Sequence, residues 1–338
     1  MSQGNETHRA KLVDDVQFND SLRERLAGSN ILISGSKGFI GSNLWNLLKK
    51  ASELEVIKPA KIVRISRSSF TSSLEVVNGV EMISMSNEYF LSNPFDIDYL
   101  FHLASPSNIT KIQKLEDVSI PNTLFLKSLL NCVRRQALYF SSSEIYRILK
   151  IENAHTFPHE ITLEKRNWYP ASKLAGENIC TDWLKNNPDQ KLSIIRLFHT
   201  YGPDLSIDDG RSFADFLWQS ILADKIVLKS DGQQKRTFLY ISDALSAFLK
   251  LIEGDHNDIE IVDVGSEREI SILQFAQLVS EITDRRLSVE PDNSFDHSKD
   301  LVLVPNLQRL RAIGWTEKVN LETGIMKTLE FMRKKSLN

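Results

Sequence analysis

Cysteine is nearly absent from this chain of 338 residues. Cys132 and Cys180 are too few for a disulfide framework or for a cysteine-rich metal site. Cys132 lies in an apolar helical run, and we expect it to be a buried small side chain. So little cysteine is typical of a reducing compartment, which predicts a cytoplasmic protein.

Long hydrophobic runs and strong net charge are lacking as well. No apolar run reaches the roughly 18 residues of a membrane-spanning helix, and residues 1–28 have no apolar signal core. The net charge of −3 gives no bulk attraction to nucleic acid or to anionic membranes. The seven histidines show no metal-ligand spacing, so we expect no metal site. A hydrophobic content of 41% is typical of a soluble globular protein.

Three glycines are concentrated in one turn, at residues 34–41, which read Ser-Gly-Ser-Lys-Gly-Phe-Ile-Gly. This G-x-x-G-x-x-G turn follows the apolar run 30–34 and precedes apolar residues at helical spacing. In such a turn Gly35 avoids a Cβ clash, Gly38 lets the backbone approach a pyrophosphate, and Gly41 lets the helix pack closely on the strand. The helix N-terminus then offers free N–H groups to phosphates. The turn therefore predicts a dinucleotide-binding site.

Tyr169 and Lys173 form a Y-x-x-x-K motif farther along the chain. Residues four apart on a helix share a face, so both side chains are expected to point into one pocket. A nearby ammonium favours the phenolate, so we expect the pKa of Tyr169 to be lowered. Such a phenol can move a proton while a nicotinamide moves a hydride.

Strand-like and helical segments alternate along most of the chain. Strands are expected at 30–34, 61–65, 98–104, 137–141 and 192–198, and helices at 39–50, 115–135 and 168–186. The alternation predicts an α/β fold with a Rossmann-type doubly wound parallel sheet. A short amphipathic helix is expected before it, at residues 9–27.

The pattern changes after Tyr201, because residues 202–212 are rich in Gly, Pro, Asp and Ser. We therefore expect a smaller, discontinuous C-terminal substrate-binding lobe. The expected boundaries are an N-terminal extension at 1–28, an NAD(P)-binding Rossmann domain at 29–201 with a return segment at about 237–265, and the lobe at 202–236 and 266–338. The apolar run 259–264 is the strand expected to return to the main sheet.

The choice between NAD and NADP depends on the residues that follow the second strand. An acid there would bind the ribose diol of NAD, but this chain has Ser66 and then Arg67. A guanidinium suits a 2′-phosphate, and Lys37 in the glycine turn adds a second cation. We expect an NAD(P) cofactor, with NADP favoured over NAD; the alternative is that both cations are solvated surface charges.

Further motifs follow in a fixed order. They are His-Leu-Ala-Ser at 102–105, Ser-Ser-Ser-Glu-Ile-Tyr at 141–146, Arg-Leu-Phe-His-Thr-Tyr-Gly-Pro at 196–203, Arg-Thr-Phe-Leu-Tyr-Ile-Ser-Asp at 236–243, and the segment 310–315. With the glycine turn and the Y-x-x-x-K motif, they resemble the extended short-chain dehydrogenase/reductase family, in its nucleotide-sugar epimerase/dehydratase branch. The resemblance covers roughly residues 30–330.

This resemblance implies roles for individual residues. Ser142 would hydrogen-bond the substrate oxygen being oxidised, Tyr169 would be the acid/base, and Lys173 would bind the nicotinamide ribose. The implied catalytic residues are Ser142, Glu144, Tyr169 and Lys173. The implied cofactor-binding residues are Gly35, Lys37, Gly38, Phe39, Ile40, Gly41, Arg67, Leu103, Ala104, Tyr169 and Lys173. The implied substrate-binding residues are Ser105, Ser142, His199, Arg211 and Arg236, with Arg236 at the substrate pyrophosphate.

The chain departs from the family pattern at several positions. Arg147 follows Tyr146 where relatives often have glycine, and His199 stands where many have asparagine. Segment 83–87 lacks the aspartate that usually contacts adenine. Ser143 replaces the aspartate of 4,6-dehydratases, whereas Glu144 resembles the acid of UDP-glucuronate decarboxylases or is a structural carboxylate.

The expected function is therefore modification of a nucleoside-diphosphate sugar through a 4-keto species, by an epimerase, reductase or decarboxylase. The competing hypothesis is a non-catalytic dinucleotide-binding sensor or partner subunit, but the complete set of Ser142, Tyr169 and Lys173 argues against it. Relatives commonly dimerise through the helices that correspond to 115–135 and 168–186, so a homodimer is expected.

Overall fold

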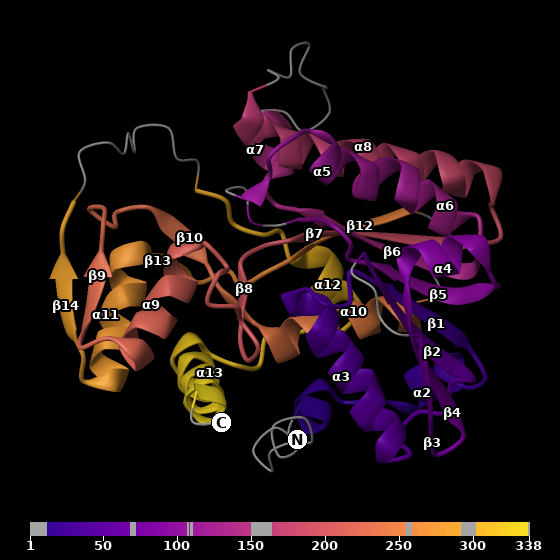
Figure 1. Ribbon diagram of the computed structural model, residues 1–338, viewed down its shortest axis with the longest axis horizontal. Helices are drawn as coiled ribbons and strands as arrows, with labels where there is room; N and C mark the ends of the chain where they lie inside the picture. Colours follow the sequence, from indigo (N-terminus) through magenta and orange to yellow (C-terminus); the bar gives the residue numbers. More distant parts are fainter. Residues whose placement is uncertain are drawn as a thin grey trace.

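A parallel β-sheet organises the larger part of the molecule (Figure 1), in a computed structural model that describes residues 12–67, 72–106, 108, 111–149, 164–254, 259–291 and 302–336. The strand order is β12-β7-β6-β5-β1-β2-β4-β3. Neighbouring strands run parallel except β3 and β4, which are antiparallel. The strands are β1 (Asn30–Ser34), β2 (Lys61–Ser66), β3 (Ser73–Val77), β4 (Val80–Ser86), β5 (Ile97–His102), β6 (Val133–Ser142), β7 (Lys191–Leu197) and β12 (Ile259–Val264). The predicted doubly wound α/β sheet is confirmed.

Helices cover both faces of this sheet. One layer contains α4 (Asn87–Ser92), α5 (Glu116–Ile120), a π-helical segment (Pro121–Phe125), α6 (Leu126–Leu130) and α8 (Lys165–Asn186). The other contains α2 (Asp20–Leu26), α3 (Phe39–Glu53), α10 (Ile241–Glu253) and α12 (Gln308–Ala312). Alternate strand residues supply the two cores: Ile31 and Ile33 face α3 and α10, whereas Leu32 faces α6 and α8. Continuously apolar strands are needed because both faces are covered.

A second group of elements lies to one side of the sheet (Figure 1). It comprises α9 (Ser212–Leu222), β9 (Lys225–Leu228), β10 (Lys235–Thr237), β13 (Glu269–Ser271), α11 (Ile272–Thr283), β14 (Arg286–Val289) and α13 (Leu321–Ser336). Two short strands, β8 (Thr200–Tyr201) and β11 (Leu239–Tyr240), pair in parallel; β8 comes between β7 and α9 in the chain, and β11 between β10 and α10. The short helix α7 (Ile145–Leu149) follows β6.

The expected helix at 115–135 is wrong in two respects. The helical stretch contains a π-helical segment that begins at Pro121, and it ends at Leu130. Residues 133–135 belong to β6, where Val133 pairs with Ile97 of β5. Cys132 consequently lies in the turn between α6 and β6 and is half-buried rather than fully buried.

The expected single helix at 9–27 is also interrupted. Residues 12–16 and α2 are separate helical turns, because Gln17 adopts a positive φ of 59° and Asn19 caps α2 by accepting a hydrogen bond from the Leu22 N–H. Residues 9–11 lie outside the described ranges. No helix in the described ranges has both the length and the apolar character that a membrane crossing requires.

Candidate active site

The glycine turn joins β1 to α3, and its backbone leaves no room for side chains at two positions. Gly35 has a φ of +71°, and a Cβ there would lie 2.6 Å from the Ala104 nitrogen. A Cβ on Gly41 would lie 2.5 Å from the Gly35 carbonyl oxygen, so α3 packs directly on the turn. Gly38 is the N-cap of α3, and no side chain caps the helix there. The first N–H groups of α3 are therefore left for a ligand, as in dinucleotide-binding turns.

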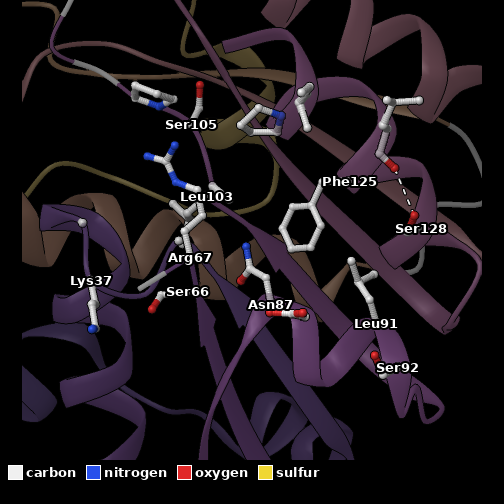
Figure 2. A pocket seen from close by; sticks show the side chains of 18 residues that line it. Lys37, Ser66, Arg67, Asn87, Leu91, Ser92, Leu103, Ser105, Phe125 and Ser128 are labelled. Atoms are coloured by element: carbon white, nitrogen blue, oxygen red, sulfur yellow. Dashed lines mark hydrogen bonds between the residues drawn. The ribbon is translucent and has the colours of Figure 1, made fainter. Parts of the chain in front are cut away.

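A cavity of about 810 Å³ extends from this turn toward α4 and α6 (Figure 2). Lys37, Ser66 and Arg67 line its polar end, and apolar side chains such as Leu91 and Phe125 line the rest. The volume and the largely apolar wall are typical of a site for a small molecule or cofactor.

A second cavity, of about 300 Å³, adjoins the first and shares Gly35, Gly38, Leu103 and Ser105 with it. Its wall adds the following predicted site residues: Phe39, Ile40, Gly41, Ser142, Glu144, Tyr169, Lys173, His199 and Arg211. Lys37, Arg67 and Ala104 line the first cavity. Every sequence-predicted site residue except Arg236 thus lies on the wall of one of these two cavities.

Tyr169 is held near Ser142 at the bottom of the smaller cavity. The two side chains are hydrogen-bonded, and the Ser142 Oγ also accepts the Glu144 backbone N–H at 3.2 Å. Burial raises the pKa of Tyr169, and the Ser142 hydrogen bond opposes this increase. The expected lowering of the Tyr169 pKa is therefore wrong, because desolvation of the phenolate outweighs the Ser142 hydrogen bond and the charge of Arg211.

Lys173 lies one turn after Tyr169 on α8 and is almost completely buried. Its Nζ donates a hydrogen bond to the Phe140 carbonyl oxygen at 2.6 Å and lies 5.9 Å from the centre of the Tyr169 ring. Burial lowers the pKa of Lys173 to about 7, and the carboxylate of Glu177 opposes that change. The motif thus places both side chains in one pocket, in contact with the end of β6.

Glu144 reaches the smaller cavity from the turn after β6. Its Oε2 forms an ion pair with the Arg147 Nε at 2.9 Å, and both side chains are about 30% exposed. Its charge also helps to raise the pKa of Tyr169. Glu144 is therefore close to the predicted acid/base, and its partner is the arginine that departs from the family pattern.

His199 also lines the smaller cavity. Burial, together with the charges of Arg211, Arg236 and Arg147, lowers its pKa to about 3. His199 is therefore neutral near pH 7. Arg211 forms a bidentate pair with Asp209. Arg236 lies on β10, off the cavity walls, and donates to the Lys235 carbonyl oxygen at 2.8 Å and to Gln234 Oε1 at 3.1 Å.

Asn122 is a buried residue of this site that sequence reasoning missed. Its Nδ2 lies 3.0 Å from each of Ser105 Oγ, Ser172 Oγ and the Val118 carbonyl oxygen, and these three acceptors share its two hydrogens. It lies in the π-helical segment, and the neighbouring Pro121 carbonyl oxygen is 3.1 Å from His102 Nε2. The signal that could have found it is Pro121, because proline inside a helical pattern indicates local distortion.

Two polar residues of the larger cavity were also missed. Asn87 and Glu88 begin α4 and line the cavity beside Leu91. Asn87 is the last residue of segment 83–87, the segment that lacks the aspartate expected near adenine, and Glu88 follows it. Among the described residues, no group of three or more His, Cys, Asp and Glu side chains is arranged to hold a metal ion.

Comparison with known proteins identifies related sequences. A family model described as the NAD dependent epimerase/dehydratase family matches residues 31–265, more than half of the chain. UDP-glucuronic acid decarboxylase 5 of Arabidopsis thaliana is 26% identical over 314 residues, which cover 87% of this chain and 86% of the relative. UDP-glucuronic acid decarboxylase 1 of Xenopus tropicalis is 26% identical over 319 residues, or 90% of this chain and 72% of the relative.

Solved structures share the fold. An epimerase of Methanothermobacter thermautotrophicus superposes with a TM-score of 0.73 at 20% identity, covering 94% of this chain and 96% of its own. The UDP-glucuronic acid 4-epimerase of Bacillus cereus, solved with UDP-glucuronic acid and NAD, superposes with a TM-score of 0.70 at 22% identity. That superposition covers 91% of this chain and 100% of the neighbour.

Proposed function

The chain belongs to the NAD-dependent epimerase/dehydratase family, and we propose that it is an oxidoreductase of this family that acts on a nucleoside-diphosphate sugar. The observation that carries this proposal is the convergence of Ser142, Tyr169 and Lys173 on a cavity that continues into the glycine turn. A non-catalytic sensor would need the turn but not a half-buried phenol hydrogen-bonded to a serine.

Different residues serve the cofactor and the sugar in the two adjoining cavities. Gly35, Gly38 and the N-terminus of α3 would hold the pyrophosphate of the dinucleotide, whose nicotinamide would supply or accept the hydride. Ser142 orients the reacting oxygen of the sugar. Tyr169 donates a proton to that oxygen, or removes one from it, and Lys173 lies beside the phenol as the adjustable charge.

The sugar that best fits the comparisons is a UDP-linked uronic acid. The curated relatives named above are UDP-glucuronic acid decarboxylases, and the Bacillus cereus neighbour was solved with UDP-glucuronic acid. Glu144, at the cavity wall next to Tyr169, supports a decarboxylase-type site. Epimerisation and reduction at the 4-keto stage use the same set of residues, so the products of UDP-glucuronic acid identify the reaction.

Turnover of Tyr169→Phe tests the proposal. Loss of the hydroxyl should reduce kcat at least about a hundredfold, the usual contribution of general acid–base catalysis, while cofactor affinity stays within about twofold because the ring remains. Products are identified by mass spectrometry after incubation with each dinucleotide and UDP-glucuronic acid. Tyr89→Phe, at an exposed tyrosine, is the control. Retention of more than about a tenth of kcat would remove Tyr169 from its role.

For the cofactor we propose NADP(H) over NAD(H). Support comes from Ser66 and Arg67 at the end of β2, and from Lys37 on the same cavity wall. Figure 2 shows Arg67 and Lys37 pointing in different directions, and Arg67 is exposed. A charged hydrogen bond contributes about 1.5–3 kcal/mol, and exposure reduces that toward the weak limit of surface pairs.

The dissociation constants of both dinucleotides decide the cofactor. Wild type should bind NADP(H) about tenfold more tightly, and Arg67→Ala should abolish that preference. The control is Arg134→Ala. Arg134 lies near the amino end of β6, away from the carboxyl ends of the strands, and is a surface cation paired with Asp96. Equal affinities in wild type would contradict the NADP(H) preference. An unchanged ratio in Arg67→Ala would mean that Ser66 and the backbone, not Arg67, hold the ribose.

We also propose a homodimer formed through the layer of α5, the π-helical segment and α8. Leu115, the N-cap of α5, is 40% exposed, a high exposure for a large apolar side chain; Ile120 and Leu124, at 46% and 67%, also line the larger cavity. Sedimentation analysis should show a dimer for wild type and a monomer for Leu115→Glu, which lies off the wall of that cavity. A monomeric wild type would contradict the proposal.

A further inference from the structure

A group of polar side chains lies behind the smaller cavity, at the carboxyl ends of the central strands. We call it the buried ion cluster, and its members are Ser141, Tyr146, Glu177, Arg196 and Asp263. They come from β6, α7, α8, β7 and β12, so five separate elements meet here. Only Ser141 also lines the cavity.

Glu177 and Arg196 form the centre of the cluster. The Arg196 Nη2 and Nε donate to the two Glu177 carboxylate oxygens at 2.8 and 3.1 Å. The Arg196 side chain is 16% exposed and the Glu177 side chain 6%. The Ser141 Oγ donates to the same carboxylate at 2.6 Å. Because bidentate charged pairs in buried surroundings have fixed geometry, this pair fixes the end of β7 relative to α8, and the Ser141 hydrogen bond does the same for the end of β6.

Tyr146 connects this centre to Asp263. Its hydroxyl donates to Asp263 Oδ1 at 2.6 Å and accepts from Arg196 Nη1 at 3.2 Å. Its ring centre lies 5.0 Å from the Arg196 guanidinium. The other Asp263 oxygen accepts the Asn306 backbone N–H at 2.9 Å.

The segment that these contacts hold carries two site residues. Ser142 is the last residue of β6, and Glu144 lies in the turn that follows it, which is closed by the Tyr146 N–H to the Ser143 carbonyl oxygen at 3.0 Å. Helix α7, which follows, has five residues and is too short to be stable by itself. The orientation of the turn therefore depends on what holds its two ends.

We propose that Tyr146 is a positioning residue that, through Arg196 and Asp263, fixes the turn carrying Ser142 and Glu144 against Tyr169. The proposal rests on the function proposed above. One end of the turn is held by Ser141 on Glu177, and the other by the Tyr146 hydroxyl. Loss of that hydroxyl leaves the core intact but lets the turn move, so chemistry should suffer before binding or stability.

The first test is kinetic, with saturating dinucleotide. Tyr146→Phe keeps the ring over Arg196 and removes both hydroxyl contacts. We expect kcat to fall about tenfold or more, with KM and the dinucleotide dissociation constant changed less than about twofold. Asp263→Asn keeps an acceptor oxygen for Tyr146 and should stay near wild type, whereas Asp263→Ala should match Tyr146→Phe. The double variant of Tyr146→Phe and Asp263→Ala should have a kcat no lower than that of either single variant, because each change breaks the same hydrogen bond between Tyr146 and Asp263.

Tyr99→Phe is the matched control. Tyr99 is a buried tyrosine off the cavity walls, and its hydroxyl donates a hydrogen bond to the Arg25 carbonyl oxygen. An effect of similar size in Tyr99→Phe would mean that any lost tyrosine bond slows turnover, and the proposal would fail. It would also fail if Tyr146→Phe kept more than about a third of kcat.

Amide hydrogen exchange tests the same proposal without turnover. In Tyr146→Phe the peptide 141–149 should exchange about tenfold faster, whereas α8 and β7 should be unchanged. Faster exchange throughout the sheet would show a structural role instead. If wild type converts no nucleotide sugar, the proposed function fails, and hydrogen exchange still decides the role of Tyr146.

Discussion

Tyr169 and Lys173 show how one pocket changes two pKa values in opposite directions. Burial penalises the charged form of each group, so it raises the pKa of the phenol and lowers that of the ammonium to about 7. Near neutral pH the phenol keeps its proton, and the lysine is close to half charged. The site is therefore set to deliver a proton, and a change in the lysine charge adjusts how readily it does so.

The pH dependence of stability should reveal the Lys173 shift. The folded pKa is about 7 and the unfolded value is 10.5. Between these values the unfolded state binds a proton that the folded state does not, so the free energy of unfolding should rise with pH. Relative to Lys173→Met, wild type should gain up to about 1.4 kcal/mol per pH unit in that window. Denaturant unfolding of both proteins at pH 7, 8 and 9 measures the difference. Parallel curves would show an ordinary lysine.

Arg236 is the site residue whose position most needs an experiment, because it lies off both cavity walls yet its charge still lowers the pKa of His199. Arg236→Ala should raise KM for the nucleotide sugar about tenfold, the effect of one lost phosphate contact, and leave cofactor affinity unchanged. Arg268→Ala, which breaks an exposed pair with Glu322, is the control. Equal losses of both affinities would make Arg236 a structural residue.

At the scale of elements, periodicity predicted the strands well and the helix before β6 poorly. The central strands are short apolar runs, so their limits were close to those observed at 30–34 and 61–66. The stretch 115–135 keeps a helical spacing of apolar residues, yet Pro121 cannot donate a backbone hydrogen bond and the π-helical segment starts there. The exit from the helix at Asn131 had no glycine or proline to mark it.

The contact of α8 with β6 depends on Gly176, which sequence reasoning did not single out. A Cβ there would lie 2.1 Å from the Tyr139 hydroxyl oxygen. That hydroxyl donates to the Lys173 carbonyl oxygen at 3.2 Å. Gly176→Ala should lower the free energy of unfolding by about 1–3 kcal/mol through overpacking, and it should lower kcat because α8 carries Tyr169.

Denaturant unfolding and kinetics of Gly176→Ala check this expectation. Adding Tyr139→Phe removes the nearest atom and should restore part of the stability. A Gly176→Ala variant with wild-type stability would show that α8 can shift outward freely.

At the scale of the whole molecule, alternation of strands and helices was enough to predict the sheet, but the packing of the N-terminal segment was not predictable. Leu12, Val13, Val16 and Phe18 are buried. Asp15 pairs with Lys327 of α13 at 2.9 Å, and Asn19 donates to Glu253 of α10. Such contacts join residues that are far apart in sequence, and composition carries no signal for them.

Phe18→Ala should therefore destabilise the molecule as a whole. Phenylalanine-to-alanine changes in a core cost about 3–5 kcal/mol. The segment also contacts two elements that lie far along the chain, α10 and α13. Asp20→Ala, at an exposed position, should be neutral. Thermal and denaturant unfolding give the comparison, and a difference below about 1 kcal/mol would show that this segment is only loosely attached.

The docking of residues 12–26 has a consequence for synthesis in the cell. This segment leaves the ribosome well before its partners, because Glu253 of α10 and Lys327 of α13 lie 234 and 312 residues after the residues that they contact. Domains generally fold as they emerge, from the N-terminal end. Here the apolar face around Phe18 stays exposed until α10 and α13 have been synthesised. Nascent chains of this protein should therefore be clients of chaperones that shield hydrophobic segments, and prematurely terminated chains should aggregate.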